Sequence, residues 1–175
     1  MKTLLSLLFF VSCITAQAQQ LKPIDSKSEV KFTVKNFGIN TPGTFSGLKG
    51  TIQFNPSTPS SASFNVSVDV NTVNTGIDMR DNHLKGEDYF NAEKYPTISF
   101  VSTGVKADNN GYIVSGQLTI KGISKPVSFP FTAVQQNGGM LFTGDFSINR
   151  KDFDVGGGSA VLSNNVDISL KVFAQ

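Results

Sequence analysis

The 175-residue chain has one cysteine, one histidine and no tryptophan. The cysteine, Cys13, lies in an N-terminal segment that we predict to be removed, so the mature protein has no thiol. Disulfide bonds, thiolate nucleophiles and cysteine-based zinc sites are thereby excluded. A single histidine, His83, makes a poor metal site without a second histidine or a cysteine. We therefore expect no metal ion and no cofactor other than a bound ligand.

Charge is also scarce, since only 16% of the residues are charged. Lysine and arginine number 15 against 13 aspartates and glutamates, which gives a formal net charge of +2. Loss of Lys2 with the N-terminal segment lowers it by one, from +2 to +1. A nucleic-acid partner would need a basic stripe, and none is present. Internal repeats and low-complexity tracts are also lacking, so we expect one domain, residues 19–175.

Residues 1–18 have the pattern of a secretory signal peptide. The apolar run at 4–14 is too short to span a bilayer, and Ala-Gln-Ala at 16–18 is typical of a cleavage site. Cleavage there places the mature N-terminus at Gln19 and predicts a periplasmic protein. Secretion, and a lipid anchor through Cys13, are the open alternatives. The residue three before Cys13 is a phenylalanine, where a lipobox normally has an aliphatic residue.

Apolar and polar residues alternate along eight segments of the chain, which is the pattern of half-buried β-strands. Short links rich in asparagine and glycine join most neighbouring segments, so adjacent strands should pair antiparallel. Strands with one apolar face bury it in a sandwich or in a closed barrel, and the pattern leaves both open. The segments are 30–34, 48–54, 64–70, 97–106, 112–120, 127–131, 142–148 and 166–172.

The only long connection is residues 75–95, which follows the third of these segments. Helical spacing after Thr75 predicts a short helix that this threonine caps. Pro96 ends the connection and begins the next strand. A second helical turn is predicted within residues 37–45.

Three motifs carry a family resemblance. They are RDNHLKGEDYFNAEKYPTISF at 80–100, LTIKGISKPVSFPF at 118–131 and INRKDFDVGG at 148–157. In this order they resemble the signature of the YceI family, bacterial periplasmic proteins that bind isoprenoid and other long-chain lipids. The resemblance covers nearly the whole mature chain. It implies an all-β fold: an eight-stranded antiparallel β-barrel, lipocalin-like, with a short helical insert.

Thirteen phenylalanines remain in the mature chain once Phe9 and Phe10 are removed from the 15. On their own they favour an ordinary packed core. The resemblance favours the wall of a long apolar cavity, about 20 Å deep for tilted strands of this length. We expect these inward residues to line it: Phe32, Val34, Phe54, Phe64, Val66, Phe100, Phe129, Phe131, Phe142 and Phe146.

Four polar residues are candidates to contact a ligand head group at the rim: Arg80, His83, Arg150 and Lys151. Each has a structural alternative, since Arg80, Asp81 and His83 could instead fasten the helical segment to the barrel. We assign no catalytic residue, because no convincing nucleophile, base or metal site is present.

The sequence therefore predicts a carrier of a long-chain isoprenoid, a quinone or a fatty amphiphile, with transient membrane contact and a homodimer left open. An enzyme acting on a hydrophobic substrate, or an interaction protein with a packed barrel, are the alternatives.

Overall fold

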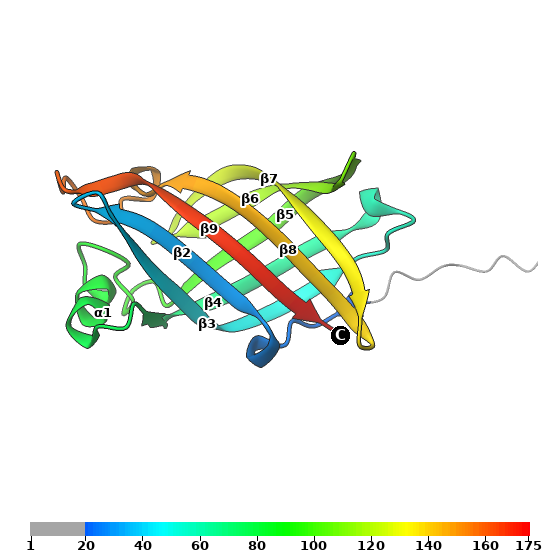
Figure 1. Cartoon of the computed structure of the whole chain (residues 1–175), viewed down its shortest axis with the longest axis horizontal. Helices are drawn as coiled ribbons and strands as arrows, with labels where there is room; N and C mark the ends of the chain where they lie inside the picture. The colour runs from blue at the N-terminus through cyan, green and yellow to red at the C-terminus, as the bar shows by residue number, and fades with distance from the viewer. Residues whose placement is uncertain (1–19) are drawn as a thin grey trace, which may run out of the picture.

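The computed structural model describes residues 20–175 (Figure 1). The predicted signal peptide, Cys13 and the mature start at Gln19 lie outside the described residues. The strands are β1 (Gln20–Leu21), β2 (Glu29–Asn36), β3 (Ile39–Gln53), β4 (Ser63–Asn74), β5 (Thr97–Asp108), β6 (Gly111–Ile120), β7 (Ile123–Gln136), β8 (Gly139–Asn149) and β9 (Leu162–Ala174). One helix, α1 (Asp78–Lys85), and three short 3-10 helices, at Asp25–Lys27, Pro59–Ser61 and Arg150–Phe153, complete them.

Strands β2 to β9 close into an eight-stranded barrel in which every pairing is antiparallel. Around the barrel the order is β3-β2-β9-β8-β7-β6-β5-β4, and β4 pairs back onto β3. Strand β1 adds two residues beside the end of β3. The predicted barrel is thus confirmed, and closure removes the free edges that a sandwich would leave.

Two-residue turns connect several of the neighbouring strands. Phe37-Gly38, Lys121-Gly122 and Asn137-Gly138 all have both residues at positive φ, as a type I′ hairpin turn requires. The predicted helical turn within 37–45 is wrong. Because Phe37-Gly38 reverses the chain at once, Ile39 onward pairs with β2 as strand β3.

The helical insert lies where the sequence placed it, between β4 and β5. Helix α1 begins after Ile77 without a side-chain cap, so the predicted capping role of Thr75 is wrong. Figure 1 shows the insert at one end of the barrel, together with the β2–β3 turn and the β8–β9 connection, and the C-terminus near the other end. Within residues 20–175 no helix is long and apolar enough to cross a membrane.

The end of the barrel away from α1 is packed solid with aromatic rings. We call Phe54, Phe64, Tyr112, Phe131 and Phe142 the aromatic plug. Phe54 meets Tyr112 at a ring-centroid distance of 5.0 Å and Phe142 at 5.4 Å, both edge to face. Phe64 meets Phe131 in the same way at 5.4 Å. Such pairs contribute about 0.5–1.5 kcal/mol each beyond the area they bury.

Candidate functional site

The half of the barrel nearer α1 contains a cavity of about 360 Å³. Such a volume is within the usual range for a small-molecule site. All eight barrel strands contribute to its wall. Apolar lining side chains are Val30, Phe32, Val34, Phe45, Leu48, Val66, Val68, Ile98, Phe100, Leu118, Ile120, Phe129, Phe146, Ile148, Val166, Ile168, Leu170 and Val172.

Many of these side chains point into the barrel and are still only partly buried, among them Val34, Val66, Ile98 and Val166. An apolar side chain that points into a barrel is normally buried by the side chains that pack against it. Here these side chains face the cavity on one side and have no packing partner there, so their apolar surface stays open to an apolar ligand.

Six of the ten predicted lining residues border the cavity: Phe32, Val34, Val66, Phe100, Phe129 and Phe146. The other four, Phe54, Phe64, Phe131 and Phe142, face the barrel interior but belong to the aromatic plug. Their rings pack against one another instead of lining open space. The cavity therefore occupies one half of the barrel, not the full length of about 20 Å that strand length alone suggests.

Three phenylalanines form the floor between the cavity and the plug. The rings of Phe129 and Phe146 are stacked with centroids 4.2 Å apart and planes within 9° of each other. Phe100 lies beside Phe129 at 5.5 Å. All three line the cavity and also pack against the cluster that contains the plug. The floor thus limits how deep a ligand reaches.

The helical insert covers part of the mouth with apolar side chains. Leu84 and Phe90 line the cavity. The ring of Phe90 meets that of Phe45 on β3 edge to face at 5.4 Å. A backbone hydrogen bond from Gly156 N to Asp88 O, 2.8 Å long, ties the insert to the β8–β9 connection. The insert is therefore held to the barrel wall from two sides.

Arg80 and Asp81 both fasten helix α1 to Thr75, just past the end of β4. Arg80 Nε donates to Thr75 Oγ1 at 2.7 Å, and Nη2 donates to Thr75 O at 2.8 Å. The buried Asp81 carboxylate accepts from Thr75 N at 2.8 Å and from Thr75 Oγ1. These charge-assisted bonds orient Arg80, which lines the cavity. Within residues 20–175 its Nη1 makes no hydrogen bond, so this nitrogen is available to an anionic or polar ligand group.

His83 also lines the cavity, from the exposed side of the mouth. Its ring lies against Tyr89 at a centroid distance of 4.9 Å, edge to face. Arg80 and His83 thus both border the cavity, and their contact with a ligand head group stays a prediction.

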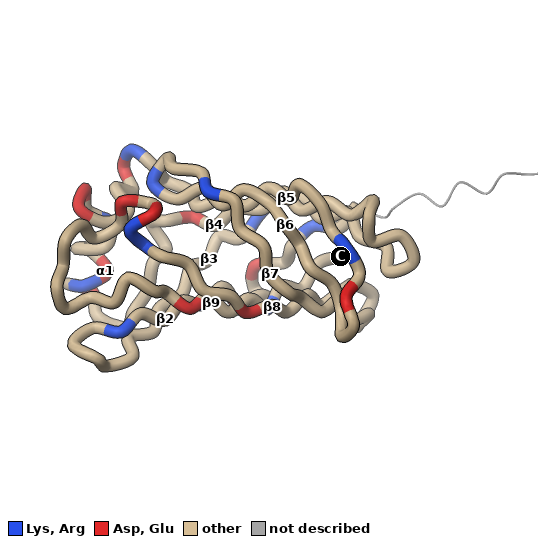
Figure 2. Tube along the Cα trace, turned by 90° about the horizontal axis from the view of Figure 1, so that it is seen from above, with Lys and Arg blue, Asp and Glu red and all other residues tan. Residues whose placement is uncertain are grey.

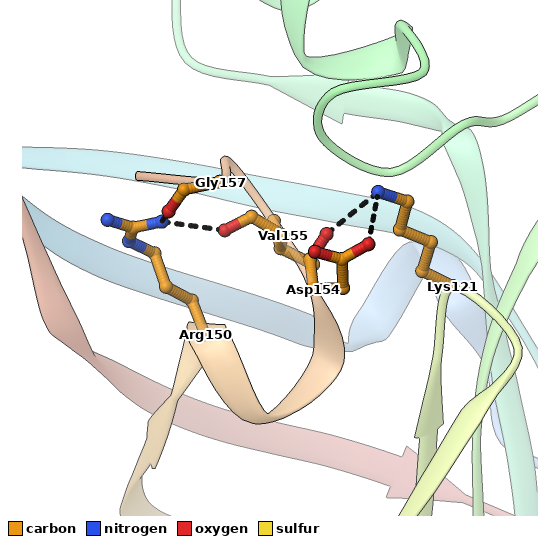
Figure 3. A network of polar contacts seen from close by, with 5 residues as sticks. All are labelled: Lys121, Arg150, Asp154, Val155 and Gly157. Carbon is orange, nitrogen blue, oxygen red and sulfur yellow. Dashed lines mark hydrogen bonds and ion pairs between the residues drawn. The ribbon is translucent and has the colours of Figure 1, made fainter. Parts of the chain in front are cut away.

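Arg150 borders the cavity but has a different role from the one expected. Arg150 is 3% exposed, and its side chain donates only to backbone carbonyls of the connection that follows it and of the first two residues of β9. The acceptors are Val155 O at 2.7 Å, Ser163 O at 2.9 Å, Leu162 O at 3.0 Å, Gly157 O at 3.2 Å and Ser159 O at 3.5 Å. Figure 3 shows two of these contacts, from the guanidinium to the carbonyls of Val155 and Gly157. Arg150 thus shapes the rim and has its five N–H donors engaged.

Lys151 is exposed and is not part of the cavity wall. The other cation in Figure 3 is Lys121, which lies across the turn from Arg150 and whose Nζ donates to Asp154 O at 2.7 Å. The structure therefore separates the two pairs of predicted head-group residues. Arg80 and His83 are at the mouth with accessible polar atoms. The donors of Arg150 are instead all bonded to backbone carbonyls, and Lys151 lies outside the cavity wall.

Sequence reasoning missed several residues of the wall. Phe45 was hidden by the predicted helical turn within 37–45, whereas Leu48 began a predicted strand but was left out of the predicted lining. Phe153 ends the 3-10 helix that begins at Arg150, and Val155 lies in the irregular chain just after it, where alternation gives no inward or outward signal. Phe90 could have been found, because an aromatic residue in a polar insert needs an apolar partner.

A closed antiparallel barrel with an apolar cavity open at one end defines a lipocalin-like binding barrel. Comparison with known proteins agrees. A sequence model of the YceI-like domain matches residues 21–174, so the chain belongs to the YceI family.

Individual relatives cover nearly the whole chain. Protein YceI of Escherichia coli O17:K52:H18 is 30% identical over 177 residues, which are 97% of this chain and 93% of the relative. A UPF0312 protein of Pectobacterium atrosepticum is 31% identical over 184 residues, 98% of this chain and 95% of the relative.

Solved structures show the same barrel. BcnA of Burkholderia cenocepacia superposes with a TM-score of 0.83 at 30% identity, over 87% of this chain and 99% of BcnA. A polyisoprenoid binding domain from Saccharophagus degradans, implicated in plant cell wall breakdown, shares the fold with a TM-score of 0.71 at 18% identity, over 89% of this chain and 97% of that domain.

Proposed function

We propose that this protein is an exported carrier that holds one long apolar chain, an isoprenoid in the first instance, inside the half-barrel cavity. The observation that carries the proposal is a wall built from the apolar faces of all eight barrel strands, with polar groups gathered at the mouth. Membership of the YceI family and the fold shared with a polyisoprenoid binding domain support the same ligand class. The proposed activity is binding and release, without catalysis and without a cofactor.

The ligand's apolar chain would enter first and its polar end would stay near Arg80 and His83. An apolar chain contributes about 0.3 kcal/mol per heavy atom for ligands of this size. One isoprene unit of five carbons then adds about 1.5 kcal/mol, which is roughly a tenfold gain in affinity. The gain should stop when the chain meets the floor at Phe100, Phe129 and Phe146.

The test is a chain-length series. Delipidated protein is titrated with prenols of increasing isoprene number, with quinones and fatty alcohols in parallel, and lipid extracted from freshly purified protein is identified by mass spectrometry. We expect affinity to rise by about tenfold per unit and then to level off. No binding of any of these amphiphiles, or affinity independent of chain length, would refute the proposal. Conversion of the bound lipid would show an enzyme instead.

A matched pair of variants locates the binding. Val166 lines the cavity and Val134 is 56% exposed on the outside of the barrel. Val166→Thr places a hydroxyl against the ligand chain at a cost of about 1–3 kcal/mol, so affinity should fall about tenfold or more. Val134→Thr makes the same chemical change on the outer surface and should leave affinity unchanged. Equal effects of the two variants would place the ligand elsewhere.

The proposal includes export to the periplasm with a mature start at Gln19. The intact mass of the exported protein decides between this form and one anchored by a diacylglyceryl group on Cys13.

A further inference from the structure

The large apolar side chains with the highest exposure gather at the cavity end of the barrel. Met79 is 84% exposed, Phe37 75% and Ile39 71%, which are the highest values among large hydrophobic residues of the described chain. Ile77, 52% exposed, directly precedes α1, and Val161, 40% exposed, lies at the end of the β8–β9 connection. We call these five residues the apolar rim. Single exposed apolar residues are ordinary, whereas several at one end of a molecule mark an interaction surface.

The rim surrounds the mouth of the cavity. Phe37 N donates to Val161 O at 2.9 Å, which joins the β2–β3 turn to the start of β9. Residues next to three of the five rim members line the cavity: Asn36, Arg80 and Leu162. Figure 1 shows the β2–β3 turn, the β8–β9 connection and α1 at this one end. No rim residue is itself part of the cavity wall.

Two uncharged stretches of chain make up much of this end. Residues 36–48 and residues 155–166 contain no lysine, arginine, aspartate or glutamate. The α1 insert at the same end carries charges of both signs, including the exposed Asp78 between Ile77 and Met79, and charges of both signs are scattered over the rest of the barrel, as Figure 2 shows. An uncharged apolar surface loses little hydration free energy when it enters hydrocarbon. A protein partner selected by charge would find little here to match.

The turn at Phe37 disagrees with local backbone preference. Phe37 has φ of +51° at the first central position of a type I′ turn, where asparagine is favoured and a bulky residue is uncommon. The equivalent turn at Asn137-Gly138 uses the favoured pair. Phe37 is thus unfavourable both for the backbone of its turn and for the burial of its ring. Residues that go against local preference in this way are typical of functional positions.

We infer that the apolar rim docks on the surface of a lipid bilayer, with the tips inserted among the lipid chains and the cavity mouth facing the membrane. The occupant is a bilayer because the tips on the β2–β3 turn and beside β9 lie on stretches without a charged residue, and hydrocarbon has no charge to pair with them; the charged residues beside Met79, Asp78 and Arg80, would stay at the level of the lipid head groups. The inference extends the proposed function, since an apolar ligand then passes between membrane and cavity without crossing water. Docking of this kind depends on apolar insertion and not on anionic lipid.

The test uses vesicles of the neutral lipid phosphatidylcholine and the full mature protein in a sedimentation assay. The triple variant Phe37→Asn, Ile39→Thr, Met79→Gln removes three tips and keeps the local preference for a turn, a strand and a helix. The control Val101→Thr, Val134→Thr changes side chains that are 46% and 56% exposed and lie outside the rim. We expect wild type and control to sediment with vesicles alike, and the triple variant to partition at least about tenfold less.

Salt separates apolar insertion from attraction between charges. Between ~0.1 and ~1 M salt the Debye length falls from about 10 Å to about 3 Å, and partitioning of the wild type should not decrease. Loss of partitioning with salt, equal partitioning of the triple variant, or wild-type protein that stays in the supernatant would each overturn the inference. A wild-type dimer that the triple variant converts to monomer in light scattering would also overturn it, because a second copy would then cover the rim.

Ligand binding in the absence of vesicles distinguishes this inference from the proposed function. Because the three substituted residues lie outside the cavity wall, the triple variant should bind short prenols in solution as the wild type does. Wild type that docks on vesicles but binds no amphiphile refutes the carrier and leaves the docking surface. Wild type that binds prenols but not vesicles refutes the docking surface alone.

Discussion

Replacement of Arg150 by alanine should destabilise the fold instead of weakening only the binding of anionic ligands. The guanidinium is buried and donates to five backbone carbonyls, three of them at 2.7–3.0 Å. A hydrogen bond to a charged group contributes about 1.5–3 kcal/mol, so three strong bonds set a gross value of roughly 4.5 kcal/mol or more. Rehydration of the carbonyls and relief of the buried charge offset part of it. We expect a net loss of about 3 kcal/mol, or about 6–12 °C in Tm for a domain of this size.

The assay is thermal unfolding of delipidated protein followed by far-UV circular dichroism, since bound lipid would add stability by mass action. Arg150→Met keeps much of the side-chain volume without donors and should lose nearly as much as Arg150→Ala, whereas Arg150→Lys should recover a part. The neighbouring Lys151→Ala removes an exposed cation and should leave the Tm unchanged. An unaltered Tm in Arg150→Ala, together with selective loss of anionic amphiphiles, would refute the reasoning and return Arg150 to the head-group site.

Three further changes test the cavity and its insert. A methyl group added in Gly43→Ala would overlap the ring of Phe32, so the ring should swing into the cavity and lower prenol affinity by about tenfold, measured by calorimetry. Phe142→Ala removes one ring of the plug; it should cost about 3–5 kcal/mol of stability and move the plateau of the chain-length series to longer prenols. Asp81→Asn weakens the bonds that Thr75 makes to the carboxylate, so amide hydrogen exchange should quicken in α1 and stay unchanged in the strands.

Most of the fold could be predicted from the sequence, because the barrel repeats one pattern: an alternating strand followed by a short turn. Each of its eight strands coincides with one of the eight alternating segments, of which only 48–54 runs one residue past its strand, and the hairpin turns contain the expected glycines. Most predicted segments were shorter than the observed strands, because strand ends carry polar residues on both faces and the alternation is lost there. Strand β3 was misread at its start, because Pro42 and Gly43 are unusual in a strand interior. In the barrel Pro42 pairs with Thr33, and Gly43 lies under the ring of Phe32.

The site was harder to predict from the sequence. Alternation indicates whether a side chain points into the barrel, but not how deep in the barrel it lies. Phe32 and Phe54 both point inward, yet one lines the cavity and the other belongs to the plug. Depth follows from the tilt and stagger of all the strands together, which no single segment encodes. Arg150 was misassigned for a related reason. The glycine-rich residues 156–158 follow it. The carbonyls of Val155 and Gly157 reach the guanidinium only once this turn has closed, and the sequence alone does not show that closure.

The two halves of the barrel divide stability and binding between them. Apolar surface around a cavity stabilises the fold less than surface in a packed core, because contacts on one side are missing. The mature chain that we predict has no thiol, so the hollow half cannot be braced by a disulfide. Its support comes from the closed ladder of strands, from the aromatic plug behind the floor, and from the bonds of Arg150 and Asp81 around the mouth. Those two buried charged groups bind backbone at the rim of the cavity, so they hold the mouth in shape while the wall stays apolar.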